Sequence, residues 1–195
     1  MDIPLQLMLL TIPSLVYIIV QQRRGQSWIE SIRRIGWKGS PPVLYLWSLG
    51  LTFILTTLGW IAFRSIPAEI LSHPNVAVSE YIDLAPTLTT FLIILFREAF
   101  QVALGEEIFF RGFLGGWLFR HFGFMVGNAL QSIIFLLPHL FLLLASTSLW
   151  PILPVQFLAG WLYGWLRYRS DSILPGWLSH SLVNTLGAFF AIGTF

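Results

Sequence analysis

Three charged residues lie close together inside a long apolar stretch of the chain: Glu106, Glu107 and Arg111. A charge in hydrocarbon is costly unless it is paired or hydrated, so carboxylates in such a setting are candidates for function. On a helix, Glu107 and Arg111 share a face, whereas Glu106 points about 100° away from Glu107. We therefore expect Glu107 to pair with Arg111, which leaves Glu106 free for chemistry. A purely structural cluster of ion pairs is the alternative.

Two further polar clusters interrupt apolar segments later in the chain. His139 follows Phe135 by four residues, and His180 precedes Asn184 by four, so each pair shares a helix face. A single buried histidine is more often a hydrogen-bonded core residue, and that alternative stays open for each histidine alone. Three polar clusters in a chain with few other buried polar groups favour one shared site.

The depth of these residues can be counted from a turn expected near Phe122. Glu106 lies 16 residues before Phe122 and His139 lies 17 residues after it, so antiparallel helices would bring both to nearly the same level. A carboxylate and an imidazole at one level can hold a water between them as a general base. His180 and Asn184 offer N–H donors of the kind expected in an oxyanion hole. The pattern predicts hydrolysis by an activated water, with no covalent nucleophile.

The composition is that of a polytopic membrane protein. Of the 195 residues, 56% are hydrophobic and 10% are charged, whereas a soluble domain carries about 25% charged residues. The chain has no Cys, which excludes disulfides, a thiolate nucleophile and cysteine metal sites. The N-terminus has no basic segment and no small-residue cleavage site, so we expect a retained first helix and no signal peptide.

We predict an all-α transmembrane bundle of about six spans plus one interfacial amphipathic helix. The expected spans are residues 3–20, 41–63, 84–122, 124–144, 151–166 and 173–192. The third is longer than one crossing requires, so a long or broken helix is expected to carry the glutamate pair below the membrane surface. Residues 21–40 are expected to form the amphipathic helix on anionic lipid, with a solvated loop helix as the alternative.

The placement of charge predicts the topology. Basic residues gather in segments 21–40, 120–123 and 167–172, whereas segment 64–83 is acidic and holds one basic residue. The positive-inside rule places the three basic segments in the cytoplasm, and segment 64–83 on the other side as a loop.

Other classes of membrane protein fit less well. The chain has no His-Glu-x-x-His, no Gly-x-Ser-x-Gly, and no Ser in a rhomboid-like elbow. None of its three Asp residues, Asp2, Asp83 and Asp171, lies deep in an expected span, which excludes an aspartyl pair. A transporter with a midplane proton site is disfavoured because paired inverted halves are not visible.

Three motifs occur in a fixed order: Glu-Glu-x-x-x-Arg at 106–111, Phe-x-x-x-His at 135–139 and His-x-x-x-Asn at 180–184. With these motifs the chain resembles the CPBP family, which includes type II CAAX prenyl endopeptidases and the Abi bacteriocin-immunity proteins. The resemblance makes residues 84–195 the expected catalytic membrane domain. Residues 1–83 carry no motif and are expected to be an N-terminal membrane scaffold.

The resemblance implies an intramembrane glutamate-dependent endopeptidase. Glu106 and His139 would activate water, and His180 and Asn184 would stabilise the oxyanion. The implied partners are membrane lipids and a peptide or protein substrate, with a lipid group on that substrate left open; nucleic acid is not expected. A non-catalytic membrane scaffold or an immunity protein is the alternative function.

The resemblance also assigns Glu107 and Arg111 to the support of the site or the substrate. No cofactor or metal is expected, because the arginine would compete with a metal for the carboxylates and Asn184 is a better oxyanion donor than zinc ligand. A zinc-dependent version of the same peptidase, with one Glu and two His as ligands, is the alternative. The expected location is a bacterial plasma membrane or an equivalent organelle membrane, as a multi-pass protein.

Overall fold

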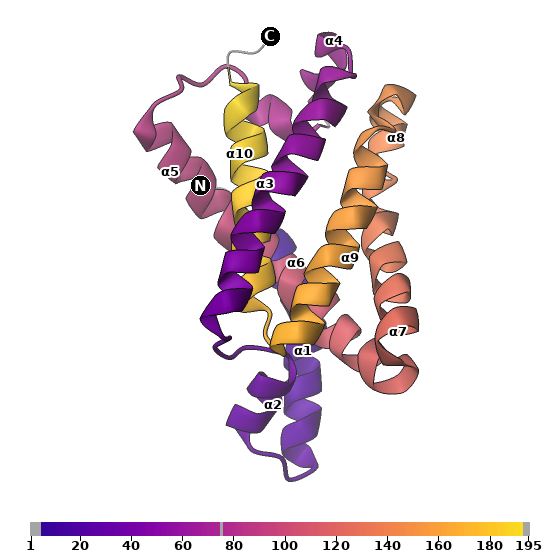
Figure 1. Ribbon diagram of the computed structural model, residues 1–195. Coiled ribbons are helices and arrows are strands. Elements are labelled where there is room, and N and C mark those ends of the chain that lie inside the picture. Colours follow the sequence, from indigo (N-terminus) through magenta and orange to yellow (C-terminus); the bar gives the residue numbers. More distant parts are fainter. Residues whose placement is uncertain (1–4, 75, 193–195) are drawn as a thin grey trace.

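The structure is a computed structural model that describes residues 5–74 and 76–192. Over those residues it is helical without strands, which confirms the all-α class (Figure 1). The α-helices are α1 (Leu5–Arg23), α2 (Trp28–Arg34), α3 (Pro42–Arg64), α4 (Ala68–Leu71), α5 (Leu88–Phe96), α6 (Leu104–Glu106), α7 (Gly116–His139), α8 (Leu142–Ala145), α9 (Ile152–Ser170) and α10 (Leu174–Ala191). Two short 3-10 helices are η1 (Ala77–Glu80) and η4 (Thr147–Leu149), and two π-helical segments are η2 (Arg97–Ala103) and η3 (Glu107–Gly115).

Three helical stretches of the described residues are long and apolar enough to cross a membrane: Leu5–Arg23, Pro42–Arg64 and Leu88–Ala145. The third has 58 residues, although about 20 suffice for one crossing. It reverses direction within α7 at Gly123, where φ is 71°, a conformation that glycine adopts without steric cost. This reversal confirms the expected turn near Phe122. Helices α9 and α10 do not meet the same standard of length and composition, so the total of six spans stays a prediction.

The outer surface of the bundle suits a hydrocarbon environment. Large apolar side chains are exposed along α1, α3 and α5, among them Leu9, Phe53 and Leu92. Exposed apolar surface on this scale would be unfavourable in water, whereas lipid chains solvate it, and the helices satisfy their own backbone hydrogen bonds. The surface therefore supports the membrane location indicated by the composition.

Helices α3, α9 and α10 lie side by side, and α7 packs along α9 (Figure 1). Helix α1 packs against the α6–η3 region. A core cluster that includes Leu55, Tyr163 and Leu166 fills the space between α3 and α9. The first two long helices thus cover the segments that carry the first and third motifs.

The connections gather at two ends of the bundle. Helices α4 and α8 lie at one end, and α2 lies at the other with the reversal in α7 and the α9–α10 connection (Figure 1). Side chains from the basic segments 21–40, 120–123 and 167–172 line one cavity at this second end. The three segments therefore share a side, as expected, and its assignment to the cytoplasm stays a prediction.

Segment 64–83 is more ordered than the loop that its polarity predicts. It contains α4 and η1, and its apolar side chains Ile66, Leu71 and Val78 are buried in one cluster with Leu149. These scattered apolar residues pack against η4 and the end of α10, so the segment forms a small packed cap on the bundle.

Segment 21–40 holds a shorter helix than expected. Helix α2 has seven residues and starts at a capping box in which the Ser27 hydroxyl accepts from the Glu30 amide. Trp28 and Ile29 are 56% and 64% exposed, but Ile35 is buried in the protein. The apolar face is therefore divided between the surface and the protein interior. Its position on a lipid interface stays a prediction.

Candidate active site

The Glu107–Arg111 pair forms the buried centre of the site. Both side chains are fully buried, and Arg111 Nη1 lies 3.2 Å from Glu107 Oε1. The arginine also lies over two aromatic rings, 4.1 Å from the centroid of Phe135 and 5.2 Å from that of Tyr163. These rings and the carboxylate offset the cost of a buried cation. The pairing expected from the four-residue spacing is present.

His180, on α10, faces both glutamates. Its Nδ1 lies 3.0 Å from Glu107 Oε1, and its Nε2 lies 3.6 Å from Glu106 Oε2. The imidazole stacks on Tyr163, with ring centroids 5.1 Å apart. Because a carboxylate only accepts, we assign a proton to Nδ1, which donates to Glu107.

Glu106 has a partner that the sequence did not reveal. Gln6 Nε2, on α1, donates to Glu106 Oε1 over 2.7 Å. The expectation that Glu106 stays free therefore holds only for its second oxygen, Oε2, which points toward His180. The N-terminal helix thus contributes a side chain to the site.

His139 is the last residue of α7 and is half-buried. Its Nδ1 lies 2.8 Å from the Phe135 carbonyl oxygen, which can only accept, so Nδ1 carries the proton and a neutral ring leaves Nε2 as an acceptor. Glu106 and His180 lie close enough to act on His139 electrostatically. The structure therefore brings His139 into the neighbourhood of the glutamate pair.

Asn184 belongs to a second polar cluster. Its Nδ2 donates to Glu98 Oε2 over 3.2 Å, and the Tyr81 hydroxyl donates to the other oxygen of Glu98 over 2.7 Å. Arg97 forms an ion pair with Glu80 and lies over the Tyr81 ring. Burial, together with the adjacent Glu98 carboxylate, raises the pKa of Tyr81 above its ordinary range, so the phenol stays a donor.

The π-helical segment η2, which lies between Glu98 and Glu107, explains how the two glutamates reach the same face of α10. Nine residues separate them, which in a regular α-helix is about 900° of rotation and would point them to opposite sides. A π turn absorbs one extra residue. The nine residues then rotate as about eight would, and the two carboxylates diverge by only about 80°. Glu98 accepts a hydrogen bond from Asn184, and Glu107 accepts one from His180. Asn184 and His180 lie one turn apart on α10.

The family model of the type II CAAX prenyl endopeptidase Rce1-like proteins matches residues 88–186. That match covers half of the chain and includes all three motifs. The chain belongs to this family. No curated protein and no solved structure matches it. Membership identifies a CAAX-protease-like membrane endopeptidase, as the motifs indicated.

The matched region of this CAAX-type endopeptidase contains the six predicted site residues. Gln6 and Tyr81, which contact two of the site's carboxylates, lie outside it. Both belong to residues 1–83, which were expected to be a scaffold without motifs. The division of the chain at residue 83 stays a prediction.

Sequence reasoning missed Glu98 although a signal was present. It is a carboxylate inside an apolar helix, the same feature that drew attention to Glu106. Gln6 and Tyr163 carry no such signal, because an amide near a chain end and a tyrosine in an apolar helix are common. Only the packing of α1 and α9 against the glutamates reveals them.

The described residues contain no group of three or more His, Asp or Glu side chains placed to hold a metal ion. In both site histidines Nδ1 already contacts a protein oxygen, the Phe135 carbonyl for His139 and the Glu107 carboxylate for His180. These contacts leave Nε2 of each ring available, which fits hydrogen bonding and the zinc alternative alike, because metal-ligating histidines usually donate their other ring N–H in this way. That the enzyme works without a metal stays a prediction.

Proposed function

We propose that this CAAX-type endopeptidase hydrolyses a peptide bond within the membrane, using a water activated by Glu106 and His139. The observation that supports this most is that residues of all three motifs converge: His180 contacts Glu107, faces Glu106 and lies close to His139. A purely structural ion-pair cluster would not require His139 at the same place.

Glu106 is the proposed general base. Gln6 holds Oε1, which orients the carboxylate and leaves Oε2 to accept a proton. In a neutral His139 the free Nε2 accepts the second hydrogen of the same water. The water oxygen then attacks the scissile carbonyl as Glu106 takes its proton. The protonated Glu106 later delivers that proton to the leaving amine as the C–N bond breaks.

His180 and Asn184 are the proposed oxyanion donors. This role requires a protonated His180, because a neutral ring that donates to Glu107 through Nδ1 leaves Nε2 as an acceptor. Both ring nitrogens then donate, Nδ1 to Glu107 and Nε2 to the developing oxyanion. Asn184 donates one Nδ2 hydrogen to Glu98 and keeps the other for the substrate.

The proposed substrate is a peptide or protein carrying an apolar chain, and the family name points to a prenylated C-terminus. A cavity of about 590 Å³ is lined by apolar residues that flank His139 in the chain, including Leu137, Leu140 and Phe141. Such a surface accepts a hydrocarbon chain. Unlipidated substrates remain the alternative within the same reaction class.

Glu106→Gln and His139→Ala test the water-activation step. Each is expected to lower kcat on a lipidated peptide by about 10² to 10⁴-fold, the usual contribution of general acid–base catalysis. Cleavage is followed by mass spectrometry with purified protein in detergent, and thermal melting reports folding.

Matched controls exist for both variants. His121 also places Nδ1 2.8 Å from a carbonyl four residues earlier, but it is exposed and lies at the basic end. Glu69 is an exposed carboxylate far from the motifs in the chain. His121→Ala and Glu69→Gln should therefore keep full activity. Full activity in Glu106→Gln would contradict the proposed activation of water by Glu106.

We further propose that the reaction needs no bound metal. Exhaustive chelation should leave the cleavage rate unchanged, and elemental analysis of the purified protein should find less than one equivalent of zinc. Activity that is lost on chelation and restored by added zinc would replace the glutamate mechanism with the zinc-dependent version.

A further inference from the structure

A cavity of about 580 Å³ lies at the basic end of the bundle, between α2, the start of α7 and the end of α9. The residues that line it include five cations but only two carboxylates, Glu30 and Asp171. The cations are Arg33, Arg34, Lys38, Arg120 and Arg167. None of them takes part in the proposed peptidase chemistry, so this arginine pocket requires a separate explanation.

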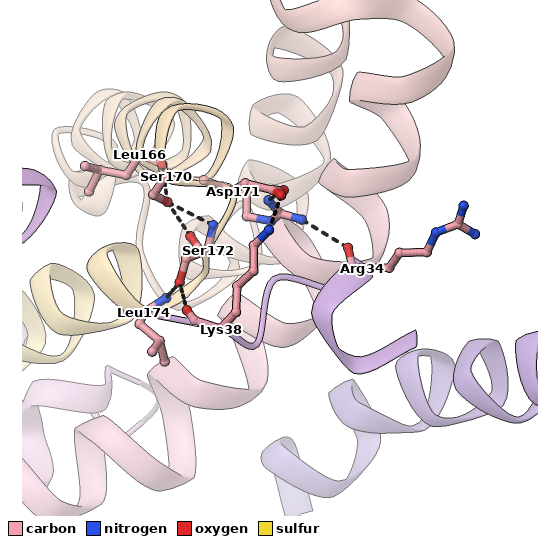
Figure 2. A network of polar contacts seen from close by, with 8 residues as sticks. Arg34, Lys38, Leu166, Ser170, Asp171, Ser172 and Leu174 are labelled. Carbon is pink, nitrogen blue, oxygen red and sulfur yellow. Dashed lines mark hydrogen bonds and ion pairs between the residues drawn. The ribbon is translucent and has the colours of Figure 1, made fainter. Parts of the chain in front are cut away.

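Both carboxylates are already engaged by the protein. Asp171 pairs with Lys38, and it accepts from Arg167 Nη1 over 2.7 Å (Figure 2). Burial alone would raise the pKa of Asp171, but hydrogen bonds from these two cations outweigh it and lower the pKa below its ordinary 3.8. Glu30 accepts from the backbone and hydroxyl of Ser27 in the α2 capping box.

Three cations are therefore left without an acidic partner. Within the part of the chain that the structure describes, Arg33, Arg34 and Arg120 form no ion pair. Figure 2 shows the Arg34 guanidinium extended away from the Lys38–Asp171 network, while its backbone carbonyl accepts from Arg167. Arg34 and Arg167 each act on Arg120 with like charge, and each does so more strongly than Asp171 acts on it with opposite charge. Such repulsion is relieved when an anion binds between them.

Two of the guanidiniums converge over a glycine. A Cβ placed on Gly116 would lie 3.3 Å from Arg120 Nη1 and 3.6 Å from Arg167 Nη2. Gly116 therefore leaves a space without a side chain beside Arg120 and beside Arg167, whose Nη1 and Nη2 already donate to Asp171 and to the Arg34 carbonyl. Arginine forks match the geometry of phosphate oxygens, which can accept two hydrogen bonds from one guanidinium. The geometry suits a phosphate group better than a single halide ion.

We propose that the arginine pocket binds the phosphate of an anionic membrane lipid. The surroundings favour a lipid over a soluble phosphate, because exposed apolar side chains lie on the elements that form the pocket. Tyr168 on α9 lines it, and Trp28 and Ile29 lie on α2 and Phe122 at the reversal of α7. Aromatic residues at the ends of spanning helices lie at headgroup level. Basic pockets between helices at that level bind anionic headgroups.

The test measures thermal melting of the full-length protein in a zwitterionic detergent at constant ionic strength. The protein is titrated with dioctanoyl phosphatidylglycerol, dioctanoyl phosphatidylcholine or sodium phosphate. Only the anionic lipid is expected to raise the melting temperature, because a ligand that binds the native state stabilises it increasingly as its concentration exceeds Kd.

Arg34→Gln and Arg120→Gln should each weaken the apparent affinity for phosphatidylglycerol by about tenfold, the effect of losing one charge-assisted hydrogen bond. Both side chains are exposed, so melting without lipid should not change. Arg24→Gln is the matched control, because it removes the same charge from the same basic segment but does not line the cavity.

Two results would overturn the proposal. An equal loss of affinity in Arg24→Gln, or no loss in the two pocket variants, would show that lipid responds only to the overall surface charge. Stabilisation by sodium phosphate equal to that by phosphatidylglycerol would assign the pocket to a soluble phosphate and reject the lipid.

Discussion

Glu98 connects the proposed oxyanion donor Asn184 to the rest of the protein. The carboxylate accepts from Asn184 on one oxygen and from Tyr81 on the other, so it fixes the plane of the amide. An amide held in this way presents its remaining hydrogen in one direction. Glu98 is therefore a positioning residue in the proposed mechanism, acting through Asn184 without touching the substrate.

Glu98→Gln should lower kcat by about tenfold with little change in KM, less than the hundredfold or more that removal of an oxyanion donor costs. The reason is that a misdirected amide loses contact with the transition state, whereas substrate binding does not depend on it. Steady-state kinetics on a lipidated peptide measure both constants.

A double-mutant cycle separates positioning from general damage. In an Asn184→Ala background, Glu98→Gln should have no further effect on kcat, because the group that it orients is already absent. Tyr81→Phe removes only the second contact of Glu98 and should fall between the parent and Glu98→Gln. Independent, additive losses in the cycle would contradict the assignment.

The contacts within single helices could be predicted from the sequence, and those between distant helices could not. Glu107–Arg111 and Phe135–His139 are four-residue pairs, so helix geometry alone brings each together. The pairing of Gln6 with Glu106 spans 100 residues and depends on where α1 docks. Nothing in the local pattern around Gln6 distinguishes it from a surface amide.

At the scale of the helices, α10 comes close to the Glu107 side chain at Gly176. A Cβ on this residue would lie 2.8 Å from Glu107 Oε2, and His180 follows one turn later on the same helix. Only a glycine lets α10 come close enough for His180 Nδ1 to reach Glu107. The absence of a side chain here is therefore a condition of the buried contact.

Gly176→Ala should lower the stability in detergent by about 1–3 kcal/mol, the usual cost of overpacking, and should also reduce kcat by displacing His180. Gly187→Ala is the matched control on the same helix, since its added Cβ would meet Phe63 at 4.0 Å, an ordinary contact. It should be neutral or slightly stabilising because alanine is the better helix former. Equal melting temperatures for the two variants would show that α10 does not approach Glu107 as described.

The π-helical winding of this long helix could not be predicted from the sequence pattern. A broken or long helix was expected over residues 84–122, and the structure gives one helical path with two changes of winding. Apolar residues surround the charged positions on nearly every side, so no stripe in the sequence records the one-residue change in register. The rotation of Glu98 toward α10 follows from that register and was therefore not predicted.

At the scale of the whole molecule, composition and charge predicted the class, the reversal near Phe122 and the gathering of the basic segments at one end. The number of spans is harder to read, because α9 and α10 carry the polar residues that serve the site and the basic end. His180, Ser179 and Ser181 are buried on α10. Helices sheltered by the rest of the bundle need less apolar sequence than those facing lipid on most sides.

The orientation of the bundle in the membrane is the last prediction, and it follows from the charge difference between its ends. Gln26 lies in the basic segment and Asp83 in the acidic one, and both side chains are exposed. Because basic segments are retained in the cytoplasm, Gln26→Cys should react with a membrane-impermeant thiol reagent only from the cytoplasmic side, and Asp83→Cys only from the opposite side. The parent chain has no Cys, so it provides the unlabelled control. Intact cells and inside-out vesicles report the two sides, and labelling of both positions from one side would contradict the topology. The expected result also places the arginine pocket at the cytoplasmic leaflet, where anionic lipids are concentrated.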